Sequence, residues 1–159
     1  MKRSCRVCWG SNVLLLGIVA LAAYTFIFGT TAEVAKDGRK AIVMSAGEKD
    51  LVLGEMRGLL EAVQAITEGV VENDLTTVAA SAHAVGMAST GGEPAALIAK
   101  LPLEFKTLGM GTHQAFDDLG NEATDMGDPQ VVLGMLGDIL QRCTSCHAGY
   151  RIDVAQSGE

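Results

Sequence analysis

An uncharged, almost wholly apolar run from Val13 to Gly29 limits what this chain can fold into more than any other feature, because such a segment meets a membrane. Its 17 residues would form a helix of about 25 Å, near the short limit for spanning a hydrocarbon core of about 30 Å. That length favours a retained anchor helix over a signal-peptide core. The small residues Thr30-Thr31-Ala32 would suit a signal peptidase, so cleavage is the alternative.

Three basic residues, Lys2, Arg3 and Arg6, precede the apolar run. Basic flanks of membrane helices stay in the cytoplasm, so we expect a cytoplasmic N-terminus, with the chain after Gly29 on the periplasmic side of the inner membrane. Residues 1–32 are therefore predicted to be a signal anchor or transmembrane helix. If the signal is cleaved, the remaining domain would be soluble in the periplasm.

The exported part of the chain is strongly acidic. Nine Lys and Arg side chains follow Gly29, against all 19 Asp and Glu, which gives a net charge of −10. Nucleic-acid binding needs a basic footprint and is not expected. A partner protein with a basic docking surface suits this charge, although surface acids would also serve solubility alone.

The exported part divides into a short polar segment and a helical domain. Residues 33–47 are polar and small, without a sustained apolar period, and are interpreted as a tether. Apolar residues then recur at helical spacing in four segments, at about residues 48–71, 75–88, 103–124 and from 129 into the cysteine motif. Asn73-Asp74 supplies a turn and an N-cap, and Asp128-Pro129 caps and opens the fourth segment. We predict an all-α domain over residues 48–159, an up-down-up-down four-helix bundle behind the N-terminal membrane-anchor helix.

The run Cys143-Thr-Ser-Cys146-His147 lies on the apolar side of the fourth helical segment. Two thiols three residues apart on a helix point the same way, so both could add to the vinyl groups of one haem. The histidine that follows could then reach the iron. We therefore predict one covalently bound haem c on Cys143 and Cys146, with His147 as an axial ligand.

Other chemistries of cysteine pairs fit less well. A structural zinc needs four ligands, but Cys5 and Cys8 precede the apolar run and would lie across the membrane from the second pair. A disulfide-exchange pair would favour a helix start after a strand. A plain disulfide between Cys143 and Cys146 stays open. Cys5-Arg-Val-Cys8 is followed by Trp9 instead of a histidine and is interpreted as incidental, or as a lipidation or redox site.

With this motif in the last helix, followed by Tyr150 and Arg151, residues 48–153 resemble the cytochrome c′ family. The resemblance implies a haem held by the two cysteines of the motif. It also implies that the histidine is the proximal iron ligand and that Arg151 lies beside it.

The resemblance further implies a role for Met56. Family members with a methionine on the first helix have six-coordinate iron and carry electrons, whereas members with an apolar residue there leave an open iron face that binds small gases. Counting back from the end of the first helix places Met56 at this position, as the sixth ligand, with ordinary core filling as the alternative. The chain departs from the family at Val52, where five-coordinate members often carry an arginine. Other candidate ligands are His83 and His113, although a lone histidine on a helix is more often solvated or hydrogen-bonded.

The resemblance implies a periplasmic cytochrome that exchanges electrons with a redox partner protein. The N-terminal apolar helix would tether it to the membrane, which is unusual in a family of mostly soluble periplasmic proteins. The alternatives are a five-coordinate cytochrome that binds nitric oxide or carbon monoxide, and a haem-bearing subunit of a larger membrane complex. Antiparallel homodimers are common in the family. The sequence has no paired-carboxylate, Ser-His-Asp or phosphate-loop signature, so an enzyme is not expected.

Overall fold

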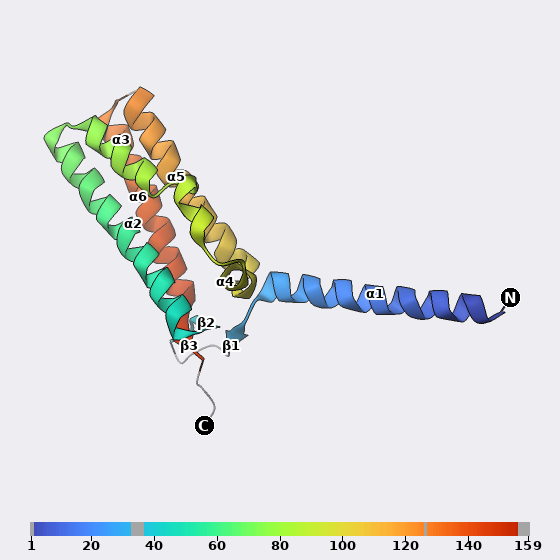
Figure 1. Cartoon of the computed structure of the whole chain (residues 1–159). Coiled ribbons are helices and arrows are strands. Elements are labelled where there is room, and N and C mark those ends of the chain that lie inside the picture. The colour runs from blue at the N-terminus through green and yellow to red at the C-terminus, as the bar shows by residue number, and fades with distance from the viewer. Residues whose placement is uncertain (1, 33–36, 126, 156–159) are drawn as a thin grey trace.

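A computed structural model of the chain describes residues 2–32, 37–125 and 127–155, with the side chains of residues 2–8 and 32 excepted. The described chain is mostly helical, which confirms the all-α expectation in its coarse form, and it adds one small sheet. Figure 1 shows a long N-terminal helix that projects away from an elongated helical body.

The N-terminal helix α1 spans Lys2–Phe28. Its segment Trp9–Phe28 has a mean hydropathy of 2.0 and none of it is buried against the rest of the chain. A helix of this length and composition suits a membrane anchor or a signal sequence. The expected apolar helix is therefore present.

The helix α2 (Ala46–Glu72) begins and ends at strong capping residues. Ser45 and Glu48 form a capping box, in which the Ser45 side chain accepts from the Glu48 N–H and the Glu48 carboxylate accepts from the Ser45 N–H. Asn73 ends the helix in the left-handed conformation, with φ of 56°. Asp74 then caps α3 (Leu75–Ala84), so the turn and cap predicted at Asn73-Asp74 are confirmed.

The helix α3 is shorter than the predicted segment 75–88, and a 3-10 helix, η1 (Met87–Gly92), follows it. The buried Gly86 lies where a Cβ would overlap the carboxylate of Asp117, and that carboxylate accepts a hydrogen bond from the Met87 N–H at 2.8 Å. Asp117 therefore holds the chain in a turn where the sequence pattern predicted one more helical turn.

Two further long helices complete the body: α5 (Leu103–Asp125), which follows the short α4 (Ala95–Lys100), and α6 (Pro129–Gly149). Asp128 caps α6 and Pro129 opens it, as predicted. The helix α2 packs on α3 and α6, and α5 packs on the same two helices. Their shared core is fully buried and contains Ile66, Val78, Phe116, Leu119, Val132 and Ile139.

Three strands lie at the end of the body from which α1 projects (Figure 1): β1 (Thr31–Ala32), β2 (Lys40–Met44) and β3 (Tyr150–Val154). The central strand β2 pairs antiparallel with β1 and parallel with β3, with Ile42 opposite Ile152. Residues 33–47 were expected to form a tether, but β2 is part of the folded body because Ala41, Ile42 and Met44 are buried. Residues 33–36 of that expected tether lie outside the described chain.

Candidate functional site

A cavity of about 470 Å³ lies where the end of α6 meets the first half of α2, the start of α5 and the strand β3, with Arg39 just before β2 also at its edge. Its size falls in the usual range for cofactor sites, about 300–1,000 Å³. The cavity collects four of the five residues predicted from the sequence, namely Met56, Cys146, His147 and Arg151.

The fifth predicted residue, Cys143, lies one turn before Cys146 on α6 and does not line the cavity. It is half-buried against the helical core, while Cys146 packs against a second core cluster that contains Ile42 and Tyr150. Both thiols are free, and burial raises the pKa of each. The two cysteines therefore lie along one side of α6, with Cys146 at the cavity.

His147 belongs to the last turn of α6, and its side chain is exposed at the cavity. The backbone around it is well fixed, because the Tyr150 N–H bonds back to the Cys146 carbonyl and β3 then pairs with β2. The end of α6 thus presents an imidazole that is accessible from the cavity, as an iron ligand must be.

Met56 is half-buried and packs against the same core cluster as Cys146. Leu53, one turn earlier on α2, also lines the cavity and is partly exposed. The helix α2 therefore presents a thioether to the cavity at the position that the resemblance singles out, with an apolar side chain one turn earlier.

Three cationic side chains line the cavity: Arg39, Lys49 and Arg151. The Arg151 guanidinium donates to Asp153 at 2.6 Å through Nη1, but its buried Nε has no hydrogen-bond partner in the described chain. An unsatisfied buried donor of this kind calls for an acceptor, and the two propionate groups of a haem are anionic acceptors. With the Asp153 carboxylate, which also lines it, the cavity carries three cations and one anion, and this net positive charge fits the propionates of a haem.

Exposed apolar side chains also lie near the predicted site residues on both helices. Leu60 follows Met56 by one turn of α2, and Leu140 precedes Cys143 by one turn of α6, so helical spacing places each on the side of its neighbour. Neither leucine lines the cavity itself, so they extend the apolar surface of each helix beyond it.

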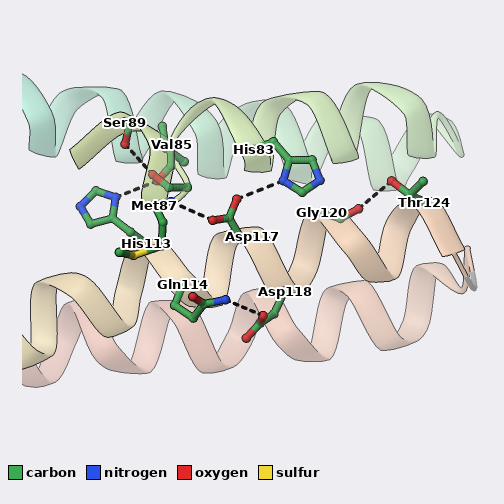
Figure 2. A network of polar contacts seen from close by, with 11 residues as sticks. His83, Val85, Met87, Ser89, His113, Gln114, Asp117, Asp118, Gly120 and Thr124 are labelled. Carbon is green, nitrogen blue, oxygen red and sulfur yellow. Dashed lines mark hydrogen bonds and ion pairs between the residues drawn. The ribbon is translucent and has the colours of Figure 1, made fainter. Parts of the chain in front are cut away.

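The other two histidines are engaged elsewhere (Figure 2). The His113 side chain is buried, with Nδ1 at 2.7 Å from the Val85 carbonyl and Nε2 at 3.0 Å from the Glu55 carboxylate. His83 Nδ1 lies 3.1 Å from Asp117, whose pKa is lowered by that contact and by the Met87 N–H. Neither histidine lines the cavity that holds His147.

No assembly of protein ligands for a metal ion is present among the described residues. The side chains of Cys5 and Cys8, and with them the alternative roles considered for that pair, lie outside the described part of the chain. A protein-only metal site is therefore not formed by Cys143, Cys146 and His147 with their described neighbours.

Arg39, Lys49 and Phe105 were not predicted as site residues, although all three line the cavity. Arg39 directly precedes β2, so its placement depends on the sheet. Lys49 lies in the first turn of α2, on the same side of that helix as Leu53 and Met56. Tyr150, Ile152 and Val154 alternate with polar residues, and this period of two was the available signal for β3.

Comparison of the chain with protein-family models, with curated proteins and with solved structures finds no match. The functional argument therefore depends on the cavity and its residues.

Proposed function

We propose that this protein is a membrane-tethered c-type cytochrome of the cytochrome c′ kind, with one haem attached to Cys143 and Cys146 and His147 as its proximal ligand. The observation that carries the proposal is the single cavity shared by Cys146, His147, Met56 and Arg151, residues that a sequence motif and a family resemblance had singled out separately. The packing of α2, α3, α5 and α6 supports the further proposal that they form the up-down-up-down bundle of that family.

A bound haem would supply reversible one-electron chemistry at its iron. The residues of this chain would hold and tune it. Cys143 and Cys146 would fix one edge through thioether bonds, and the cationic Arg39, Lys49 and Arg151 lie where they could neutralise the propionates. The apolar side chains around the cavity would keep water from the ring.

Met56 is proposed as the sixth ligand, which would leave no open iron site and would make the protein an electron carrier. A five-coordinate cytochrome that binds nitric oxide or carbon monoxide is the second candidate, because Met56 packs against a core cluster and could serve there as core filling alone. An optical spectrum of the reduced protein with and without carbon monoxide separates the two, since only an open iron face gives an immediate carbon monoxide complex.

We further propose that α1 anchors the domain to the periplasmic face of the inner membrane, with Lys2, Arg3 and Arg6 in the cytoplasm. The acidic exported part, with its net charge of −10, suits a redox partner with a basic docking surface. Membrane fractionation and N-terminal mapping test the anchor: a mature chain beginning at Glu33 would show a cleaved signal instead.

Extraction with acidified acetone tests the haem attachment, because it removes a non-covalent haem and leaves a thioether-linked one. The unmodified protein should retain its haem, and the double variant Cys143→Ser, Cys146→Ser should not. The matched control is Cys5→Ser, Cys8→Ser, which removes the same number of thiols with the same spacing and should leave the haem bound. Release of haem from the unmodified protein would contradict the proposal.

A further inference from the structure

A second cavity, of about 730 Å³, lies between the end of α1 and the start of α5. Its walls are mostly apolar and include Ile27, Phe28 and Leu103. Two charged side chains, Lys40 and Glu104, line it as well. The cavity therefore combines an apolar interior with one cation and one carboxylate.

The end of α1 is fixed against the body at this cavity. The Thr30 N–H donates to the Lys100 carbonyl at 2.7 Å, and Lys106 Nζ donates to the Phe26 carbonyl at 3.3 Å. The same ammonium lies 4.3 Å from the centre of the Phe26 ring. With α1 in the membrane, the cavity would open at the outer edge of the bilayer, where an amphiphilic molecule could enter from the lipid.

A short polar connection joins this cavity to the proposed haem cavity. Tyr150 lines the haem cavity, and its hydroxyl donates to the Glu104 carboxylate at 2.6 Å. Lys40 Nζ lies 3.7 Å from the same carboxylate oxygen. Along the chain, Glu104 at the second cavity is followed directly by Phe105 at the haem cavity. The two cavities are therefore neighbours that share a wall.

We infer that this second cavity binds a membrane-soluble quinone and its hydroquinone form. The apolar walls suit the ring and the first isoprenoid units. Lys40 can donate to a quinone carbonyl, and Glu104 can accept from a hydroquinone hydroxyl. A fatty acyl chain alone would offer no polar group to Lys40 or Glu104, which would then interact only with each other and with Tyr150.

An anionic phospholipid headgroup fits less well than a quinone. The hydrogen bond from Tyr150 and the charge of Lys40 lower the pKa of Glu104, so this carboxylate is ionised at neutral pH and would repel a phosphate. The ring of a quinone or hydroquinone is neutral and can accept or donate hydrogen bonds, so it meets no such repulsion.

The inference rests on the proposed haem for its electron step and on the retained anchor for access to the membrane. Oxidation of one hydroquinone to the quinone releases two electrons and two protons. Two ferric haems, each reduced to the ferrous form in a separate encounter, accept the electrons. The protons pass from the hydroquinone hydroxyls to the Glu104 carboxylate and from there to water. The protein would then receive its electrons from the membrane.

The test measures binding of a benzoquinone with one isoprene unit to the full-length protein in mild detergent, by equilibrium dialysis. Leu103→Trp fills the cavity, and Leu133→Trp on α6 is the matched control, since these leucines are similarly exposed, at 41% and 47%. We expect saturable binding with one quinone per chain, weakened about tenfold or more by Leu103→Trp and unchanged by the control. Thr107→Trp, at the same cavity, serves if the first variant does not fold.

Equal affinity in the cavity-filled and control variants would overturn the inference. So would a phospholipid, found by native mass spectrometry, that the quinone does not displace. The same dialysis on Cys143→Ser, Cys146→Ser keeps the two proposals separate, because binding should persist there without haem. In the haem-loaded protein, Glu104→Gln should slow haem reduction by the hydroquinone about tenfold or more while the quinone affinity stays within about twofold.

Discussion

Met56 on α2 and His147 on α6 line one cavity, although most of the folded chain separates them in sequence. The side chains approach this cavity from different helices, as a pair of axial ligands on two faces of a haem would have to do. This relationship gives the sixth-ligand proposal a geometric basis beyond the family resemblance.

If Met56 is the proposed sixth ligand of a haem, Met56→Ala should convert the iron from six- to five-coordinate. The thioether is a soft ligand that stabilises ferrous iron, so its loss should lower the reduction potential and open the iron to carbon monoxide. The long-wavelength charge-transfer band of the ferric protein should disappear from the optical spectrum. Met135→Ala is the control, because Met135 packs on the helical core away from the cavity. A high-spin spectrum in the unmodified protein would instead favour the gas-binding candidate.

Ionisation of Glu48 should make the free energy of unfolding depend on pH in the acid range. Two hydrogen bonds from Lys100 Nζ, at 2.7 and 2.8 Å, and one from the Ser45 N–H lower the pKa of Glu48 from its usual 4.5 to about 2. A lowered pKa stabilises the fold above about pH 4.5, and this contribution is lost as the pH falls towards 2. In Glu48→Gln, chemical unfolding at several pH values should show a smaller decline over this range. Asp50→Asn, which removes an exposed charge in the same turn, should decline as the unmodified protein does.

Ionisation of His113 should make the stability of the protein fall as the pH rises, the opposite of the effect of Glu48. The hydrogen bond to Glu55 and the one to the Val85 carbonyl raise the pKa of His113 above 6.5, and Glu93 adds to this, while burial opposes it. Asp117 is a further charged group that interacts with His113, and its own pKa is lowered in part by that imidazole. Since a raised pKa favours the protonated folded form, the stabilisation is complete below about pH 6.5 and is lost as the pH rises through the folded-state value.

Glu55→Gln keeps an acceptor for His113 but removes the charge. We expect the pKa of His113, followed by its NMR ring protons, to fall, and the loss of stability on the alkaline side to shrink. Glu61→Gln, on an exposed part of α2, should leave the titration unchanged. An unchanged pKa of His113 in Glu55→Gln would show that the Val85 carbonyl, and not Glu55, keeps this pKa raised.

Gly69 should tolerate no side chain. A Cβ there would lie 2.8 Å from the buried Val78 side chain and 3.1 Å from the Asp74 carbonyl, where α2 and α3 approach closely. Gly69→Ala should therefore lower the free energy of unfolding by about 1–3 kcal/mol. Gly58→Ala on the same helix, with open space around its Cβ, should raise it by up to about 1 kcal/mol. Thermal or denaturant unfolding of the two variants gives the comparison.

Local chemistry predicted much of the helical structure. Asn73, Asp74, Asp128 and Pro129 mark helix ends in the sequence, and the structure places helix ends there. Helix caps can be predicted from the sequence because each capping side chain bonds to backbone groups only two or three residues away. The end of α3 was missed because it depends on Asp117, a partner from another helix.

The sheet, and with it Arg39 at the candidate site, could not be predicted in the same way. Parallel pairing of β2 with β3 places Lys40 opposite Tyr150, although nearly the whole folded part of the sequence lies between them. No local pattern encodes such a distant partner. Arg39 approaches the cavity only once that sheet forms. Lys49 could have been found from the sequence, since it precedes Met56 on α2 by two turns. The motif residues were predictable because Cys143, Cys146 and His147 share one helix.

The junction at Gly29 has a consequence for how the protein would meet its partners. Gly29 adopts a φ of +60°, and a side chain there would overlap the backbone of Lys100–Pro102. With α1 in the bilayer, a junction this close would make the domain share the tilt and rotation of the helix. The domain would then diffuse in the plane of the membrane at a fixed height above the lipid. Because it could not rotate independently of the helix, only partners that approach its exposed docking side could bind.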